Sequence, residues 1–71
     1  MYVAMYGERV REFREEKGMS KRGLAAAAGI TPKAARRAER EEPVSLWTAR
    51  KIAAALGAES PQGLGRPLDR A

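Results

Sequence analysis

Residues 20–40 of this 71-residue chain, SKRGLAAAAGITPKAARRAER, decide its fold. Ser20 can cap a helix through its hydroxyl group, and Gly29 can stop that helix and permit a turn. Thr31 followed by Pro32 is typical of a second helix start, because a helix does not need an N–H at its first position. The stretch therefore predicts two short helices joined by a tight turn, with Ile30 as the apolar residue at the corner.

The second of these helices is predicted to have two unlike faces. Ala35 and Ala38 point inward, while basic residues recur at spacings of three and four and share the opposite face. These basic residues are Lys33, Arg36, Arg37 and Arg40. The segment from Lys21 to Arg40 holds six basic residues and one acidic residue, so it carries the whole formal charge of +5. A positive charge confined in this way predicts a surface for a polyanionic partner and disfavours a merely solvated helix face.

Segments on both sides are predicted to add further helices. Tyr6, Val10 and Phe13 recur at the spacing of one helical face, which predicts a helix over residues 5–17 that ends at Gly18. Residues 1–4 suit either an extension of this helix or a short edge strand, and the extension is favoured.

A last helix is predicted between Ser45, as its cap, and Gly57. Its inward residues are expected to be Leu46, Ala49, Ile52, Ala53 and Leu56. Trp47 is expected to lie in the core or at its rim. Proline and glycine interrupt the periodicity from residue 58 onward, although Ser60-Pro61 could start one further turn. We therefore expect a helix-turn-helix domain over residues 1–57 and a short, mostly flexible tail over residues 58–71.

Composition sets the class of protein and excludes several functions. A chain of 71 residues with few strand formers predicts one all-α domain, a compact bundle of four to five short helices. The absence of cysteine and histidine leaves no disulfide, no metal-ligand spacing and no nucleophile with its base, so we expect no cofactor, no metal and no enzyme activity. There is no apolar run of roughly 20 residues and no secretory signal, so a cytoplasmic protein without a membrane partner is expected.

The order of these features resembles the phage repressor and Cro-like (XRE-type) helix-turn-helix family. The resemblance covers about residues 7–57 and rests on GERVREFREEKGMS at residues 7–20, Leu24-Ala25, Gly29-Ile30-Thr31, Glu39-Arg40 and residues 48–56. It implies a lambda-repressor-like fold whose second motif helix enters the major groove of double-stranded DNA, usually as a homodimer. It also implies transcription regulation of the phage or bacterial type, by repression more often than activation.

The resemblance further implies roles for individual residues. Arg14 and Glu39 occupy positions that commonly join in a partly buried ion pair. Arginine can donate two hydrogen bonds to guanine, whereas lysine and helix N-termini suit phosphates. The residues expected to face DNA are Thr31, then Lys33, Arg36 and Arg37 as base readers, and Lys21, Arg22 and Arg40 as backbone contacts.

The sequence departs from the family pattern at several places, and other functions stay open. Lys21 stands where the family often has a glutamine that contacts a phosphate, which keeps a donor and adds charge. Glu41 stands near the usual position of a glycine, and Ala35 and Ala38 replace bulkier apolar residues, so the helix that carries them is expected to lie closer to the core. An adaptor could keep the fold and bind a protein partner through Trp47 and residues 64–71. An antitoxin or excision-type factor would share the same domain, and structured-RNA binding is weakened by the lack of aromatic residues near the basic face.

Overall fold

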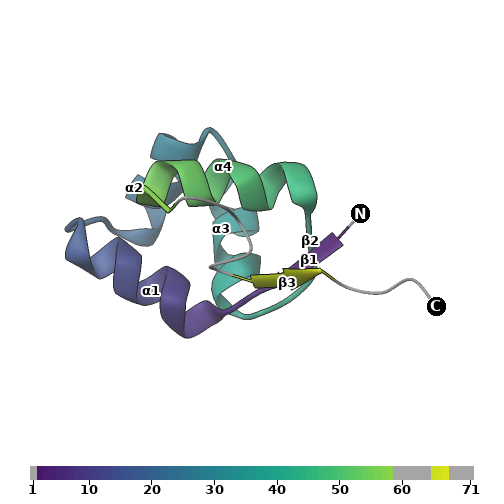
Figure 1. The fold of residues 1–71 in the computed structure, drawn as a ribbon. Helices are drawn as coiled ribbons and strands as arrows, with labels where there is room; N and C mark the ends of the chain where they lie inside the picture. The colour runs from purple at the N-terminus through teal and green to yellow at the C-terminus, as the bar shows by residue number, and fades with distance from the viewer. Residues whose placement is uncertain (1, 59–64, 68–71) are drawn as a thin grey trace.

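The computed structural model describes residues 2–58 and 65–67, which form four helices and a three-stranded sheet. The helices are α1 (Gly7–Glu16), α2 (Lys21–Ala28), α3 (Pro32–Glu39) and α4 (Leu46–Leu56). The strands are β1 (Tyr2–Met5), β2 (Val44–Ser45) and β3 (Gly65–Pro67). The helices pack together, and the small sheet lies at one end of the bundle (Figure 1). The expected all-α bundle is therefore confirmed, with a small sheet that was not predicted.

The core is built from side chains of all four helices and of β1 and β2. Its largest fully buried members are Met5, Leu24, Ile52, Leu56 and Val10. The helices α2, α3 and α4 contribute mainly alanines to it, which lets their backbones approach closely. The buried alanines are Ala25, Ala28, Ala35, Ala38, Ala49 and Ala53. The four alanines of α3 and α4 among them are predicted from the sequence to face inward. Of the inward residues expected on α4, Leu46 alone is only partly buried.

The favoured prediction for the N-terminus, a helical extension, is wrong. Residues 2–5 form β1, and the strand is central rather than at an edge, because the strand order is β2-β1-β3. Val3 and Met5 point into the core and are 4% and 0% exposed, while Tyr2 points away and is 54% exposed. This alternation is the pattern of a half-buried strand, and it places both apolar side chains in the core.

The start of α1 is set by a contact between distant parts of the chain. Helix α1 begins at Gly7, two residues later than predicted, and a Cβ at this position would clash with the carbonyl oxygen of Glu39. The N–H of Gly7 donates to a carboxylate oxygen of Glu41 at 3.0 Å. Glycine is therefore needed here for the close approach of α1 to the end of α3.

Tyr6, expected on one helical face with Val10 and Phe13, and Trp47, expected in the core or at its rim, both lie at the surface. Tyr6 is 41% exposed and Trp47 is 59% exposed. Tyr6 precedes α1 as its N-cap residue and is extended, so it does not share the helical face of Val10 and the half-buried Phe13. Trp47 lies on α4 two residues before the buried Ala49, on the outward side of the helix.

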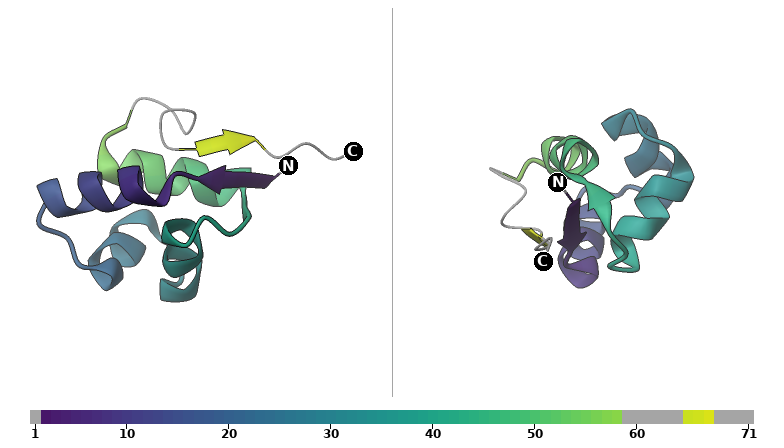
Figure 2. Two further views of the ribbon diagram at one scale, coloured as in Figure 1. Left: turned by 90° about the horizontal axis from the view of Figure 1, so that it is seen from below. Right: turned by 90° about the vertical axis from the view of Figure 1, so that its right-hand side faces the viewer.

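The C-terminal segment contributes a strand. Gly65–Pro67 pairs with β1 antiparallel, with Ala4 opposite Arg66, and the two strands run side by side in opposite directions (Figure 2). Sequence reasoning had given this segment no regular structure. The further turn expected at Ser60-Pro61 and the rest of the predicted flexible tail lie outside the described residues.

Candidate nucleic-acid interface

The segment α2–turn–α3 has the local geometry that its sequence predicts. The Ser20 hydroxyl accepts a hydrogen bond from Gly23 N at 2.9 Å, and Thr31 Oγ1 accepts one from Ala34 N at 3.1 Å, so both helices are capped as expected. Gly29 ends α2 with φ 72°, a left-handed conformation that suits glycine. Ile30 follows, half-buried against the core. The turn thus fixes α3 relative to α2.

Helix α3 separates an alanine face from a basic face. Ala35 and Ala38 are both 0% exposed. At 3.6 residues per turn, Lys33 and Arg40 lie nearly opposite this buried face, and Arg36 and Arg37 flank them on either side. The exposed side chains are Lys33, Arg36, Arg37 and Arg40, and at the start of α2 Lys21 and Arg22 are exposed as well. The positive charges of this segment are thus presented to solvent together.

Two of these arginines make ion pairs at the surface. Arg37 Nε lies 3.4 Å from a carboxylate oxygen of Glu42, and an Arg40 guanidinium nitrogen lies 4.0 Å from the other. The side chains involved are 44% to 67% exposed, and surface pairs of this kind contribute little. Arg36 makes no ion pair with any described residue. All three guanidinium groups are therefore available to an anion that competes with Glu42.

A nearly buried ion pair lies beneath α3. Arg14 of α1 donates from Nε to Glu39 at 2.7 Å and from a terminal nitrogen to the Met19 carbonyl at 2.8 Å. The side chains of Arg14 and Glu39 are 11% and 3% exposed. Arg11 approaches the same carboxylate from the solvent side at 3.8 Å. Because one end of the pair lies on each helix, it fixes the orientation of α3 against α1.

Sequence reasoning missed the role of Glu41, which links α3 to α1. Glu41 has φ 62°, a left-handed conformation that is uncommon outside glycine. Its carboxylate accepts from Gly7 N at the start of α1, where an acidic group is favoured. The sequence did hold a signal, since Glu41 stands where the family pattern has a glycine. Glu41 therefore adopts the left-handed backbone conformation that suits a glycine, and its carboxylate adds the contact with Gly7.

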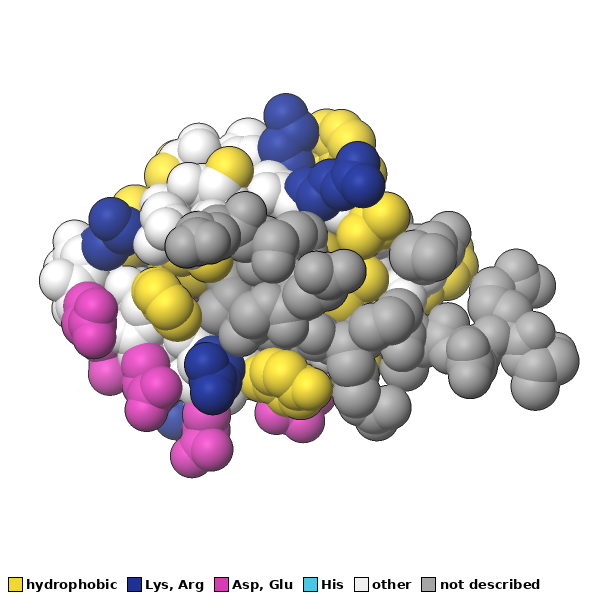
Figure 3. Space-filling model, viewed as in Figure 1, with side chains coloured by type: hydrophobic (Ala, Val, Ile, Leu, Met, Phe, Trp, Pro, Cys, Tyr) yellow, Lys and Arg dark blue, Asp and Glu magenta, His cyan; other side chains and the backbone are white. Residues whose placement is uncertain are grey.

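Charge of the opposite sign gathers elsewhere on the molecule. A shallow hollow on α1 is lined by Glu12, Glu15 and Glu16, and acidic side chains cluster over α1 in the face shown in Figure 3. No group of acidic residues in residues 2–58 or 65–67 has the arrangement of a metal site. No helix in the described part of the chain is long and apolar enough to cross a membrane. The basic surface is thus the feature of these residues that best defines a binding site.

This combination of a capped α2, a glycine turn and an outward basic α3 defines the structure as a helix-turn-helix domain. A family model described as Helix-turn-helix matches residues 10–64. The chain therefore belongs to the phage repressor and Cro-like (XRE-type) helix-turn-helix family. No curated protein matched the chain with significance.

Among solved structures, the chain is similar to one described as a SinR protein/SinI protein complex. The TM-score is 0.73 and the sequence identity is 31%. The match covers 83% of this chain and 58% of that chain. The chain thus spans little more than half of that relative's length.

Proposed function

We propose that this chain is a sequence-specific DNA-binding transcriptional regulator, a repressor or Cro-like factor without catalytic activity, which inserts α3 into the major groove. The observation that carries the proposal is the outward basic face of α3. A major groove about 12 Å wide admits an α-helix, and arginine recognises guanine there through two hydrogen bonds.

The proposed roles follow from position on the two helices. Lys33, Arg36 and Arg37 read base edges, while Lys21, Arg22 and Arg40 contact phosphates. The Thr31 hydroxyl oxygen accepts from Ala34 N in capping α3, and its O–H can still donate to a DNA phosphate. Glu42 releases Arg37 to a base edge and Arg40 to a phosphate when DNA binds, because an exposed ion pair is easily exchanged.

The test is a selection from a random duplex library at two salt concentrations. We expect binding that weakens steeply as salt rises and a selected sequence that is nearly palindromic, with half-sites about 34 Å apart if a homodimer binds. Arg36→Ala should relax the preference at one position, because a bidentate contact to guanine contributes about 1–3 kcal/mol of discrimination. Arg22→Ala is the matched control, and it should weaken binding to all duplexes alike. Binding with no sequence preference would contradict the proposal.

A second candidate function is an adaptor that binds a protein partner. It is favoured by the exposure of Trp47 and by the fact that the similar solved structure is a complex of two proteins. Removal of residues 64–71 tests it against a candidate partner. Loss of partner binding with DNA binding intact supports the adaptor, and unchanged partner binding contradicts it.

A further inference from the structure

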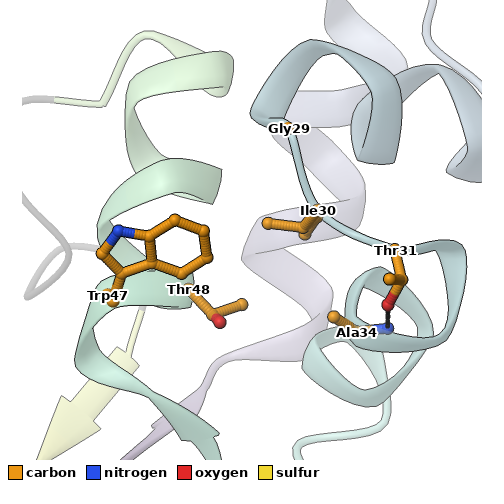
Figure 4. A pocket seen from close by; sticks show the side chains of 6 residues that line it. All are labelled: Gly29, Ile30, Thr31, Ala34, Trp47 and Thr48. Atoms are coloured by element: carbon orange, nitrogen blue, oxygen red, sulfur yellow. Dashed lines mark hydrogen bonds between the residues drawn. The ribbon is translucent and has the colours of Figure 1, made fainter.

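The most exposed large apolar side chain of the described residues lies beside the helix-turn-helix. Trp47 of α4 is 59% exposed and borders a hollow of about 570 Å³ between α4 and the turn. In Figure 4 the Trp47 ring and the Ile30 side chain point toward one another across this hollow. The residues that line it are Gly29, Ile30, Thr31, Ala34, Trp47 and Thr48.

The hollow is continuous with the proposed DNA surface. Thr31 and Ala34 belong to the cap and first turn of α3, so one wall of the hollow is the same helix end that enters the groove in the proposed function. A duplex bound by α3 would therefore bring the backbone of one DNA strand toward the opposite wall of the hollow, which is formed by α4.

A positive charge stands at the rim of this hollow. The Lys51 ammonium group lies 5.1 Å from the centre of the Trp47 ring, a distance typical of a cation–π contact. Lys51 lies roughly 60° around α4 from Thr48, which lines the hollow, whereas Arg50 lies roughly 160° away. Lys51 therefore lies on the side of α4 that faces the hollow, next to the Trp47 ring, and Arg50 lies on the other side.

An apolar wall with a cation at its rim matches the chemistry of the DNA backbone. Each nucleotide offers an apolar deoxyribose beside an anionic phosphate, and protein contacts to these groups fix the position of a helix in the groove. We infer that Trp47 and Lys51 form an additional contact to the DNA backbone, with the indole ring against a deoxyribose and the ammonium group on the adjoining phosphate. This inference rests on the proposed function and extends the interface from α3 to α4.

The first measurement uses Trp47, the one tryptophan of the chain, as the probe. A duplex obtained from the library selection is added to the full chain, and binding is followed independently by the fluorescence anisotropy of labelled DNA. We expect saturating DNA to change the tryptophan emission and to protect it from acrylamide quenching. If anisotropy shows binding while emission and quenching stay unchanged, the contact is refuted and the proposed function stands.

The second measurement compares two neighbouring variants of α4. Lys51→Ala should reduce the slope of log K against log salt by about 0.9, the value for one phosphate contact. The control is Arg50→Ala, which removes another exposed basic residue on the far side of the helix and should leave the slope unchanged. Equal slopes for the two variants would overturn the inference.

The last comparison concerns the ring itself. Trp47→Ala should weaken DNA binding roughly tenfold if the duplex covers about 60 Å² of the indole, at about 25 cal/mol per Å². Trp47→Phe should retain most of the affinity, and circular dichroism establishes that both variants are folded. An emission change that depends on protein concentration without DNA would assign the hollow to a second copy of the chain and refute the DNA contact. Failure of every duplex to bind would refute the proposed function and this inference together.

Discussion

Removal of Arg14 is expected to destabilise the domain far more than removal of Arg11. Both arginines approach Glu39, but Arg14 is 11% exposed and 2.7 Å away, while Arg11 is 57% exposed and 3.8 Å away. In Arg14→Ala the carboxylate of Glu39, 3% exposed, loses its main partner. The Met19 carbonyl loses its donor in the same variant.

The magnitude follows from burial. Loss of one partner from a buried ion pair costs about 3–5 kcal/mol, and Arg11 can partly replace Arg14 from the solvent side, so we expect about 3 kcal/mol. In a domain of this size that loss lowers Tm by about 12–24 °C. Arg11→Ala removes an exposed contact and should cost about 0.5 kcal/mol or less.

The assay is thermal and urea unfolding followed by circular dichroism, with a third variant as a control for the mechanism. Arg14→Met combined with Glu39→Leu removes both charges, and it should recover much of the stability lost in Arg14→Ala because no unpaired charge remains buried. Equal Tm values for Arg14→Ala and Arg11→Ala would refute the reasoning. A double variant no more stable than Arg14→Ala would also refute it.

Three further substitutions test the packing around α3 by the same unfolding measurements. Gly7→Ala should destabilise the domain by about 2–3 kcal/mol, because the added Cβ meets the Glu39 carbonyl. Glu8→Ala at the exposed neighbouring position should change stability little, and equal effects of the two variants would contradict the close approach of α1 to α3. Glu41→Ala should cost about 1 kcal/mol of stability, because the cap on α1 is lost. Glu41→Gly should be nearly neutral, because relief of the left-handed backbone strain offsets that loss. A Glu41→Gly variant as unstable as Glu41→Ala would show that the strain is absent. Ala38→Leu should destabilise the domain by about 1–3 kcal/mol, because this position is 0% exposed. Ala26→Leu on the exposed side of α2 should change the stability by no more than about 0.5 kcal/mol. A tolerated Ala38→Leu would mean that α3 is not packed closely on the core.

The helices and their caps could be predicted from sequence because they depend on neighbouring residues. The caps at Ser20, Thr31 and Ser45 use a side chain and an N–H three residues apart, and all three are present. The buried alanines of α3 follow from periodicity alone in the same way. The residues of the candidate interface could be named for the same reason, since their spacing places them on one helical face.

Predictions failed where the outcome depends on residues far apart in the sequence. The N-terminal residues Tyr2–Met5 have no strong preference between helix and strand, and their pairing with Val44–Ser45 and Gly65–Pro67 decides the matter. Tyr6 is expected on the helical face of Val10 and Phe13, and Trp47 in the core or at its rim, yet a core filled by alanine and smaller aliphatic residues leaves both exposed.

The sequence by itself determined a helix-turn-helix with a basic second helix, because capping, helical periodicity and charge spacing act within a few residues. The family resemblance also indicated the Arg14–Glu39 pair, and periodicity indicated the buried alanines of that helix, and the structure has both. Only the tertiary structure decided that the contact of Glu41 with Gly7 holds the end of the helix against α1. It also decided that Trp47 lies beside the turn, with the Lys51 ammonium group over its ring. These contacts join residues distant along the chain, and their energies exist only once the helices have packed.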